Sequence, residues 1–206
     1  MTDALHHAIQ YLEGKAPRPP EAAALVTDLQ QAEKTTKQQK FRYTYDALVG
    51  TWRLGFITGT RRSRQQAGGL LGAGRFLPSW LTIQITYSPT APGQDLQAAK
   101  ALRSEGQWGT VQNIVRLGSL SLEVAGPTRL WPGTNILAFD FPRVKVSLGA
   151  LRLYGGYIPQ GQEREAQFYQ QPLKEQAFFN YFLLEDSYVA ARGRGGGLAL
   201  WVRVGK

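Results

Sequence analysis

The residues with the most reactive side chains do not combine into a nucleotide-binding motif. The segment GGLLGAGRF approaches a phosphate-binding loop, because four residues separate Gly69 from Gly74. Such a loop continues with lysine and a hydroxyl side chain that binds magnesium, but Arg75 and Phe76 stand at these positions. The GRGGG run at 193–197 lies between two strand-like segments and so opens no helix. The sequence therefore predicts no phosphate-binding loop.

Groups for metal binding and acid–base catalysis are equally scarce. The chain has no cysteine, and its two histidines, His6 and His7, are neighbours whose side chains would diverge by about 100° on a helix. No Gly-x-Ser-x-Gly elbow occurs. Glu185 and Asp186 would face opposite sides of a strand, which argues against an acid–base pair. We expect no catalytic residue and no metal site, and hence a protein that is not an enzyme.

The composition indicates a folded protein that attracts anionic partners. The 206 residues are 43% hydrophobic and 19% charged, which excludes intrinsic disorder, and the 23 glycines indicate many turns. The net charge of +9 favours a polyanion, either nucleic acid or an anionic membrane surface. No apolar run reaches the roughly 18 residues that span a bilayer, so we expect a soluble or peripheral protein.

The elements that would position these residues change character near residue 48. Helical spacing predicts helices at 3–13 and 20–38, and later segments alternate with a period of two. Many short strands at close spacing predict an antiparallel sandwich or barrel, with helical turns or a lid at 93–104 and 160–176. We expect a helical segment at 1–45, a β domain at 46–206, and strands at 49–59, 80–87, 107–116, 119–125, 134–140, 143–148, 150–154, 180–192 and 197–204.

The C-terminal stretch YFLLEDSYVAARGRGGGLALWVRV predicts a β-hairpin that turns at its glycine run. This turn would leave Arg192 and Arg194 at the rim of a barrel. The first and last strands of a closed barrel meet, so an arginine near the C-terminus could stack on Trp52 of the first strand. After the turn, one face would carry Leu198, Leu200, Val202 and Val204, and the other Ala199, Trp201 and Arg203.

Large apolar side chains on the strands predict either an apolar pocket or a packed core. In TWRLGFITG the period of two places Trp52, Leu54 and Phe56 on one side and Ile57 on the other. A partly filled barrel would hold one apolar ligand, whereas a filled one would be all core.

The segment RRSRQQAGGLLGAGRFLPSWL is the candidate for membrane contact. Its arginines suit anionic lipid, and its aromatic residues suit the headgroup boundary. A loop folded over the barrel mouth is the alternative. The candidate docking residues are Arg61, Arg62, Arg64, Leu70, Leu71, Phe76 and Trp80.

Three segments, LVGTWRLGFITG, FDFPRVKVSLG and the C-terminal stretch, resemble the plastid lipid-associated protein or fibrillin family, including its cyanobacterial members. The C-terminal motif is the most specific, with matches at Leu184, Glu185, Asp186, Arg192, Gly193 and Gly197. The resemblance spans most of the chain. It implies a lipocalin-like barrel at thylakoid membranes or lipid globules, peripheral or cytoplasmic in a cyanobacterium and plastidial in a eukaryote.

The resemblance further implies binding or transport of apolar molecules such as prenylquinones, carotenoids or fatty acids. No cofactor is expected beyond such a bound lipid, quinone or carotenoid. The partners expected are this ligand and an anionic membrane surface, with no nucleic acid. The candidate ligand-binding residues, some apolar and some fixing orientation, are Trp52, Leu54, Phe56, Ile83, Phe139, Arg143, Tyr154 and Asp186.

Two other functions remain open on the sequence. A phycobilin chromophore lyase on a similar barrel could hold a tetrapyrrole with Asp140 and Arg143. A basic β-protein could instead stack single-stranded nucleic acid on Trp80, Trp108 or Tyr157.

Overall fold

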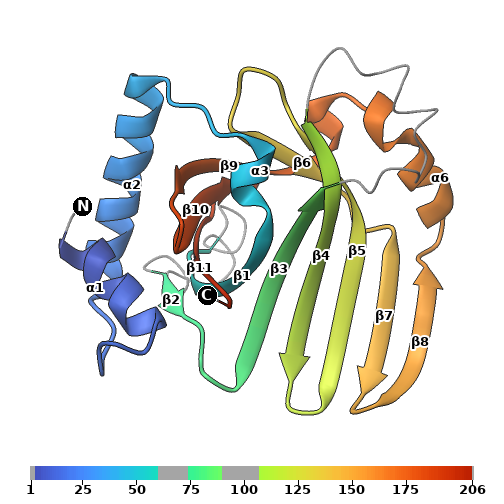
Figure 1. Cartoon of the computed structure of the whole chain (residues 1–206), viewed down its shortest axis with the longest axis horizontal. Helices are drawn as coiled ribbons and strands as arrows, with labels where there is room; N and C mark the ends of the chain where they lie inside the picture. Colours follow the sequence, from blue (N-terminus) through green and yellow to red (C-terminus); the bar gives the residue numbers. More distant parts are fainter. Residues whose placement is uncertain (1–2, 60–73, 90–106, 206) are drawn as a thin grey trace. The chain divides into compact units, whose positions relative to one another are not determined.

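The structure, a computed structural model, describes residues 3–59, 74–89 and 107–205. Three helices, α1 (Asp3–Leu12), α2 (Ala22–Gln39) and α3 (Tyr45–Leu48), precede the first strand (Figure 1). The strands are β1 (Gly50–Ile57), β2 (Arg75–Phe76), β3 (Leu81–Pro89), β4 (Gln107–Leu117), β5 (Leu120–Leu130), β6 (Ile136–Phe139), β7 (Arg143–Leu148), β8 (Leu151–Tyr157), β9 (Ala177–Leu184), β10 (Tyr188–Gly193) and β11 (Leu198–Arg203). Between β8 and β9 lie α6 (Gly161–Gln167) and the 3-10 turns η1 (Phe168–Gln170) and η2 (Leu173–Glu175).

The strands pair as one antiparallel system. The order of hydrogen-bonded neighbours is β4-β3-β1-β11-β10-β9-β6-β5-β7-β8, with β2 added to β1. A further pairing of β4 with β5 closes eight of these strands into a barrel. The expected mainly β fold, an antiparallel barrel after two N-terminal helices, is confirmed.

The chain divides into two compact units. Of the described residues, unit 1 comprises 3–41, 52–59, 74–79 and 179–205, and unit 2 comprises 42–51, 80–89 and 107–178. Unit 1 thus joins the N-terminal helices to the first and last strands of the β region.

In unit 1, helices α1 and α2 cover one face of the sheet formed by β1, β11, β10 and β9. The buried residues of α1 recur at helical spacing, which gives the helix one apolar stripe. The strand residues in the same cluster alternate along β11, as the sequence predicts. The cluster contains Leu5, Ala8, Ile9, Leu12, Leu25, Leu29, Phe56, Phe182, Ala190, Leu198, Leu200 and Val202.

A bulge in β1 corrects the prediction that Trp52, Leu54 and Phe56 share one side. The register with β11 shifts between Leu54 and Phe56, so Gly55 is an extra residue and Phe56 turns to the helix-covered face. Leu12 of α1 lies directly over the bulge, because a Cβ on Gly55 would lie 2.4 Å from its methyl groups. The close approach of α1 therefore requires glycine here.

The C-terminal stretch contains two hairpins where we expected one. The predicted strand at 180–192 is wrong, because it divides into β9 and β10 around a turn at Glu185. In this turn the Glu185 amide donates to the Tyr188 carbonyl. The glycine run does form the last turn, between β10 and β11, with Gly196 at a φ of 85°. This part of the prediction is confirmed.

In unit 2, strands β3, β4, β5, β7 and β8 form one long sheet (Figure 1). The paired registers show that its two faces differ in polarity. Directly opposed residues of an antiparallel pair lie on the same face, so the printed registers assign every side chain. The helical turns expected at 160–176 are present as α6, η1 and η2. The turns or lid expected at 93–104 lie outside the described residues.

Candidate functional site

The candidate site is one face of the unit 2 sheet, which we call the apolar face. Its cross-strand rows are formed almost entirely by aliphatic residues, and it runs along β4 from Gly109 to Val115, roughly 20 Å at about 3.4 Å per residue. Its members on β3, β4, β5 and β7 are Ile83, Ile85, Tyr87, Gly109, Val111, Asn113, Val115, Leu122, Val124, Gly126, Val144 and Val146. The end of the apolar face at Tyr87 and Val111 is buried, with each residue 1% exposed, whereas Leu122 towards the other end is 40% exposed.

Tyr45 of α3 covers one end of the apolar face. Its hydroxyl donates to main-chain carbonyls of β3 and β4, at 3.0 Å from Ser88 O and 3.3 Å from Thr110 O, and lies 2.9 Å from Thr128 Oγ1. A Cβ on Gly109 would lie 1.9 Å from this hydroxyl, so glycine leaves the space that the phenol occupies. Burial raises the pKa of Tyr45 to about 12, partly offset by the hydrogen bond with Thr128. The phenol is therefore a neutral, structural group.

Asn113 is the one amide side chain on the apolar face within the part of the chain that the structure describes. It lies opposite Ile85 of β3 and Val124 of β5, with Val111 and Val115 as its neighbours on the same face of β4. Its Oδ1 atom is buried and accepts no hydrogen bond from the described residues. Leaving a buried acceptor unsatisfied costs about 1–3 kcal/mol. Asn113 thus places an unused hydrogen-bond acceptor on an otherwise apolar surface.

The opposite face of the unit 2 sheet is polar and is partly covered by the segment from α6 to η2. Arg129 is only 8% exposed, and its guanidinium lies 4.3 Å from the ring centroid of Trp131 and 5.8 Å from that of Trp108. Its Nη1 atom donates to the Tyr169 carbonyl at 3.3 Å. Arg129 is thus held between aromatic rings, as part of the packing between β5 and η1.

Arg143 and Asp140 both form ion pairs with α6. Arg143 binds Glu165 through two nitrogens, with Nε 3.0 Å from Oε2, and this contact raises the pKa of its guanidinium. Asp140 accepts two hydrogen bonds from Arg164, one from Nε at 3.1 Å. The register places Arg143 opposite Ala125 and Tyr157, on the polar face.

Of the residues predicted to bind ligand, three lie on the apolar face. Ile83 and Tyr154 belong to one cross-strand row, at opposite sides of the sheet, and Tyr154 is 52% exposed. Phe139 of β6 lies opposite Thr128, close to the end that Tyr45 covers. Arg143 lies on the other face of the sheet, away from Ile83 and Asn113.

The remaining predicted ligand residues belong to unit 1. Trp52 and Leu54 lie on the face of its sheet that α1 and α2 do not cover, and Leu54 is opposite Trp201. Phe56 packs against the helices instead, as described above. Asp186 is exposed in the turn between β9 and β10, where its main-chain carbonyl accepts a hydrogen bond from Arg203 Nε at 2.6 Å.

Most predicted docking residues lie outside the described part of the chain, namely Arg61, Arg62, Arg64, Leu70 and Leu71. Phe76 is half-buried, and its ring lies 5.0 Å from that of Phe56 and 5.4 Å from that of Tyr11. Trp80 is 64% exposed and comes directly before β3. Trp80 therefore keeps the exposure that membrane contact requires, whereas Phe76 is committed to packing.

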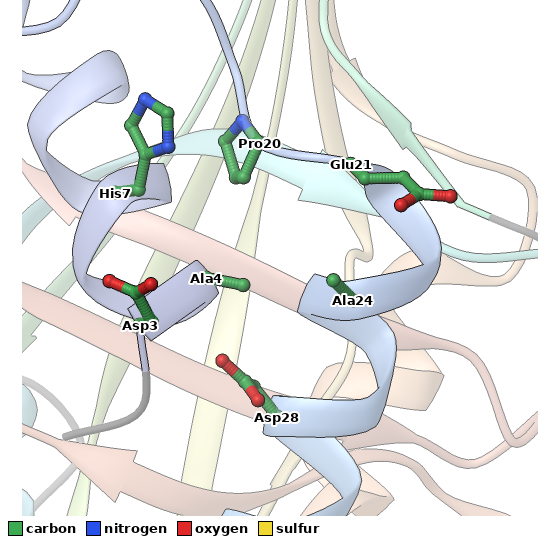
Figure 2. A pocket seen from close by; sticks show the side chains of 7 residues that line it. All are labelled: Asp3, Ala4, His7, Pro20, Glu21, Ala24 and Asp28. Atoms are coloured by element: carbon green, nitrogen blue, oxygen red, sulfur yellow. The ribbon is translucent and has the colours of Figure 1, made fainter.

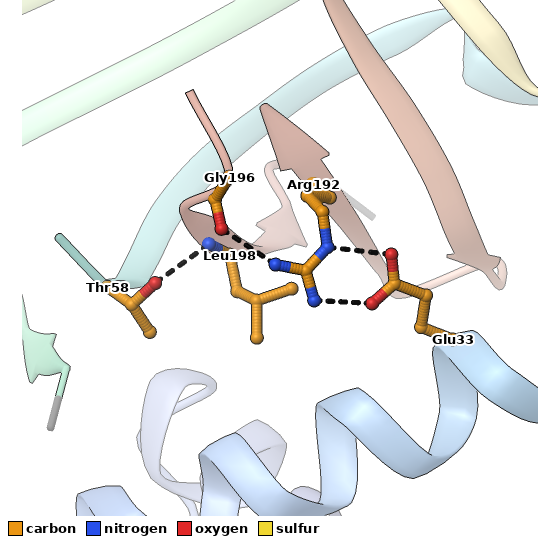
Figure 3. A network of polar contacts seen from close by, with 5 residues as sticks. All are labelled: Glu33, Thr58, Arg192, Gly196 and Leu198. Carbon is orange, nitrogen blue, oxygen red and sulfur yellow. Dashed lines mark hydrogen bonds and ion pairs between the residues drawn. The ribbon is translucent and has the colours of Figure 1, made fainter. Parts of the chain in front are cut away.

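Arg192, which the sequence predicts at the rim of the barrel, is bound to two partners within unit 1. Figure 3 shows its guanidinium reaching Glu33 of α2 and the carbonyl of Gly196, the latter at 2.7 Å. The Glu33 carboxylate raises the pKa of this guanidinium. In the same network the Leu198 amide donates to Thr58 Oγ1 at 2.8 Å. Arg192 thus fixes α2 to the last hairpin.

A groove of about 520 Å³ lies between α1 and α2 and was not predicted from the sequence. Figure 2 shows its lining, with Asp3 and His7 on α1 and with Glu21 and Asp28 across from them at α2. Asp28 is already engaged, because its Oδ2 accepts a hydrogen bond from the Leu5 amide at 3.0 Å. Among the described residues no three His, Cys, Asp or Glu side chains come together as a metal site.

Asn113 was also missed, although the sequence carries a signal for it. The alternation of β4 places Asn113 in line with Val111 and Val115, so a polar residue interrupts an apolar stripe.

Within the ranges that the structure covers, no helix is long and apolar enough to cross a bilayer. No protein-family model matches the sequence, and no curated protein matches it significantly.

Proposed function

We propose that this protein binds or transports an apolar lipid or isoprenoid, such as a prenylquinone, a carotenoid or a fatty acid, without transforming it chemically. The observation that carries the proposal is Asn113, whose buried Oδ1 atom accepts no hydrogen bond from the described residues and lies on a face of aliphatic side chains. Apolar binding sites typically combine a hydrophobic wall with a few polar groups that orient the ligand.

The chemistry of the amide oxygen narrows the class of ligand. A carbonyl oxygen accepts hydrogen bonds, so its partner must carry a hydroxyl or a protonated carboxyl group. Prenylquinols, hydroxylated carotenoids and protonated fatty acids meet this requirement and have hydrocarbon chains that would lie along the apolar face. Burial of such a chain contributes about 25 cal/mol per Å² of apolar surface.

The resemblance to the fibrillin family favours thylakoid membranes or lipid globules as the place of action. The net charge of +9 is consistent with an anionic membrane as partner. The lyase alternative is weakened because Asp140 and Arg143, the pair that would hold a tetrapyrrole, are each ion-paired with α6.

Fluorescence titration with cis-parinaric acid, a polyene fatty acid, tests the proposal. Wild type should bind the probe saturably. Val115→Ser removes apolar surface beside Asn113 and should weaken binding by about fivefold or more. Ile114→Ser is the matched control, because Ile114 is half-buried on the same strand but lies opposite Gln84 and Glu123 on the polar face.

The control should leave the affinity within about twofold of wild type. Absence of saturable binding by the wild type would contradict the proposal. Equal losses in the two variants would also count against it, because the effect would then not depend on the face of the sheet.

A further inference from the structure

One end of the unit 2 sheet carries an exposed row of leucines that the ligand site does not use. Each leucine of this row lies directly opposite the next one on the neighbouring strand. In the strand order β3, β4, β5, β7 and β8, the row consists of Leu81, Leu117, Leu120, Leu148 and Leu151. Opposed residues share a face, so the five side chains form one continuous line across five strands. We call this line the leucine edge.

The leucine edge lies where the strands turn. The β4–β5 hairpin turns at Gly118 and the β7–β8 hairpin at Gly149, each with a φ of 57°, and both turns lie at the lower end of the sheet in Figure 1. Two leucines therefore flank the tip of each hairpin. Leu120 is 42% exposed and Leu151 63% exposed. Large exposed residues gathered in this way mark an interaction surface.

Charge and aromatic residues at the leucine edge identify its partner. Arg116 and Arg152 adjoin the row, and no acidic residue occurs at 114–122 or 146–154. Trp80, which directly precedes Leu81, is strongly exposed at the same end of the sheet. Leucines with flanking arginines and an exposed tryptophan suit the interface of an anionic bilayer. There the leucines can contact acyl chains, the tryptophan can lie at the headgroup level and the arginines can bind anionic headgroups.

We propose that the leucine edge is a membrane-docking surface, and that the tips of the two hairpins insert into the headgroup region of an anionic lipid bilayer. A second copy of the chain is a poorer partner, because it would bring the same arginines together without an opposing carboxylate. The inference rests on the membrane part of the proposed function and names the surface that serves it. It keeps Trp80 from the predicted docking residues and adds to it residues on two β-hairpins.

Docking by this edge would place the apolar face next to the lipid phase. The pair Leu117 and Leu120 is followed, on the same side of the sheet, by the pair Val115 and Leu122 of the apolar face. An apolar ligand could then move between the bilayer and the protein along one continuous hydrocarbon surface.

Co-sedimentation of the full chain with lipid vesicles tests the inference. Vesicles of phosphatidylcholine alone are compared with vesicles that also contain phosphatidylglycerol. We expect wild type to bind the anionic vesicles, and Leu120→Ser combined with Leu151→Ser to lower the partition coefficient by about tenfold or more. Both residues are exposed, so circular dichroism should show an intact fold.

Two further variants separate the contributions. Arg116→Gln combined with Arg152→Gln should weaken binding to anionic vesicles by about tenfold and leave binding to neutral vesicles nearly unchanged. Val204→Ser, a control at an exposed apolar residue of unit 1 that is 38% exposed, should bind like the wild type.

Unchanged binding by the leucine variant would overturn the inference, as would a wild type that binds no vesicles. A wild-type dimer that the leucine variant converts to a monomer, with vesicle binding unchanged, would identify a self-association surface and also overturn it. Titration of the same variants with cis-parinaric acid keeps the two proposals apart. Loss of vesicle binding with retained probe binding would support docking by the leucine edge. Absence of probe binding in the wild type would contradict the proposed ligand binding and leave the membrane docking standing.

Discussion

The guanidinium of Arg203 lies 3.9 Å from the centroid of the Trp52 ring. The two residues are directly opposed in the pairing of β1 with β11, so the first strand of the β region is joined to the last. The main-chain carbonyl of Asp186 accepts a hydrogen bond from Nε of the same arginine. The stacking of a C-terminal arginine on Trp52, expected from the sequence, is confirmed.

This pair predicts a measurable coupling. A double-mutant cycle of Trp52→Phe and Arg203→Ala, followed by urea unfolding, should give an interaction energy of about 0.5–2 kcal/mol. Arg18→Ala, at an exposed position between α1 and α2, should change the free energy of unfolding by less than about 0.5 kcal/mol. Additive effects of the first two substitutions would show that the contact contributes no stability.

Gly55 should tolerate no side chain. Gly55→Ala would force the Leu12 side chain away from β1, and we expect a loss of about 1–3 kcal/mol in the free energy of unfolding. Gly156→Ala is the control, because the nearest atom to its added Cβ is Tyr154 Oη at 4.0 Å. If both variants unfold at the same urea concentration, α1 does not pack on the bulge as described.

Tyr45 should make the protein sensitive to alkali. Burial raises the pKa of Tyr45 from 10.0 to about 12, so the unfolded chain loses this proton at a lower pH than the folded one. The stability that the raised pKa of Tyr45 contributes to the folded protein is therefore fully present below pH 10, and it is lost as the pH rises towards 12. It amounts to about 3 kcal/mol, at 1.36 kcal/mol for each pKa unit.

The measurement is urea unfolding of wild type and Tyr45→Phe between pH values of about 9 and 12. The stability of wild type relative to the variant should fall across this range, because phenylalanine has no proton to lose. A constant difference would mean that the Tyr45 hydroxyl ionises as readily in the folded protein as in the unfolded chain.

Asn113→Leu should separate stability from binding. The substitution removes a buried acceptor that no described residue satisfies, so the free energy of unfolding should rise by about 1 kcal/mol. It also removes the group that we propose orients the ligand, so the affinity for cis-parinaric acid should fall by about fivefold. A variant that is less stable and binds normally would assign Asn113 a structural role only.

The local sequence pattern was sufficient to predict most helices and strands, but it was not sufficient to predict which face of the sheet each side chain occupies. The helices α1 and α2, most strands and the last glycine turn follow from periodicity and from glycine and proline positions. The bulge at Gly55 does not, because the packing of Leu12 from another element decides it. Period two assigns residues to two sides of a strand, yet only the pairing shows that Arg143 and Asn113 lie on opposite faces of one sheet. The ion pairs of Arg143 and Arg192 likewise depend on helices distant in the sequence.

The most direct test of apolar ligand binding is mass spectrometry of organic extracts from the protein purified out of its native host. Wild type, Val115→Ser and the control Ile114→Ser are prepared identically. The account predicts one class of apolar lipid enriched on wild type and on the control, and depleted on Val115→Ser. Extracts without an enriched lipid, or with the same lipid equally abundant on all three proteins, would contradict it.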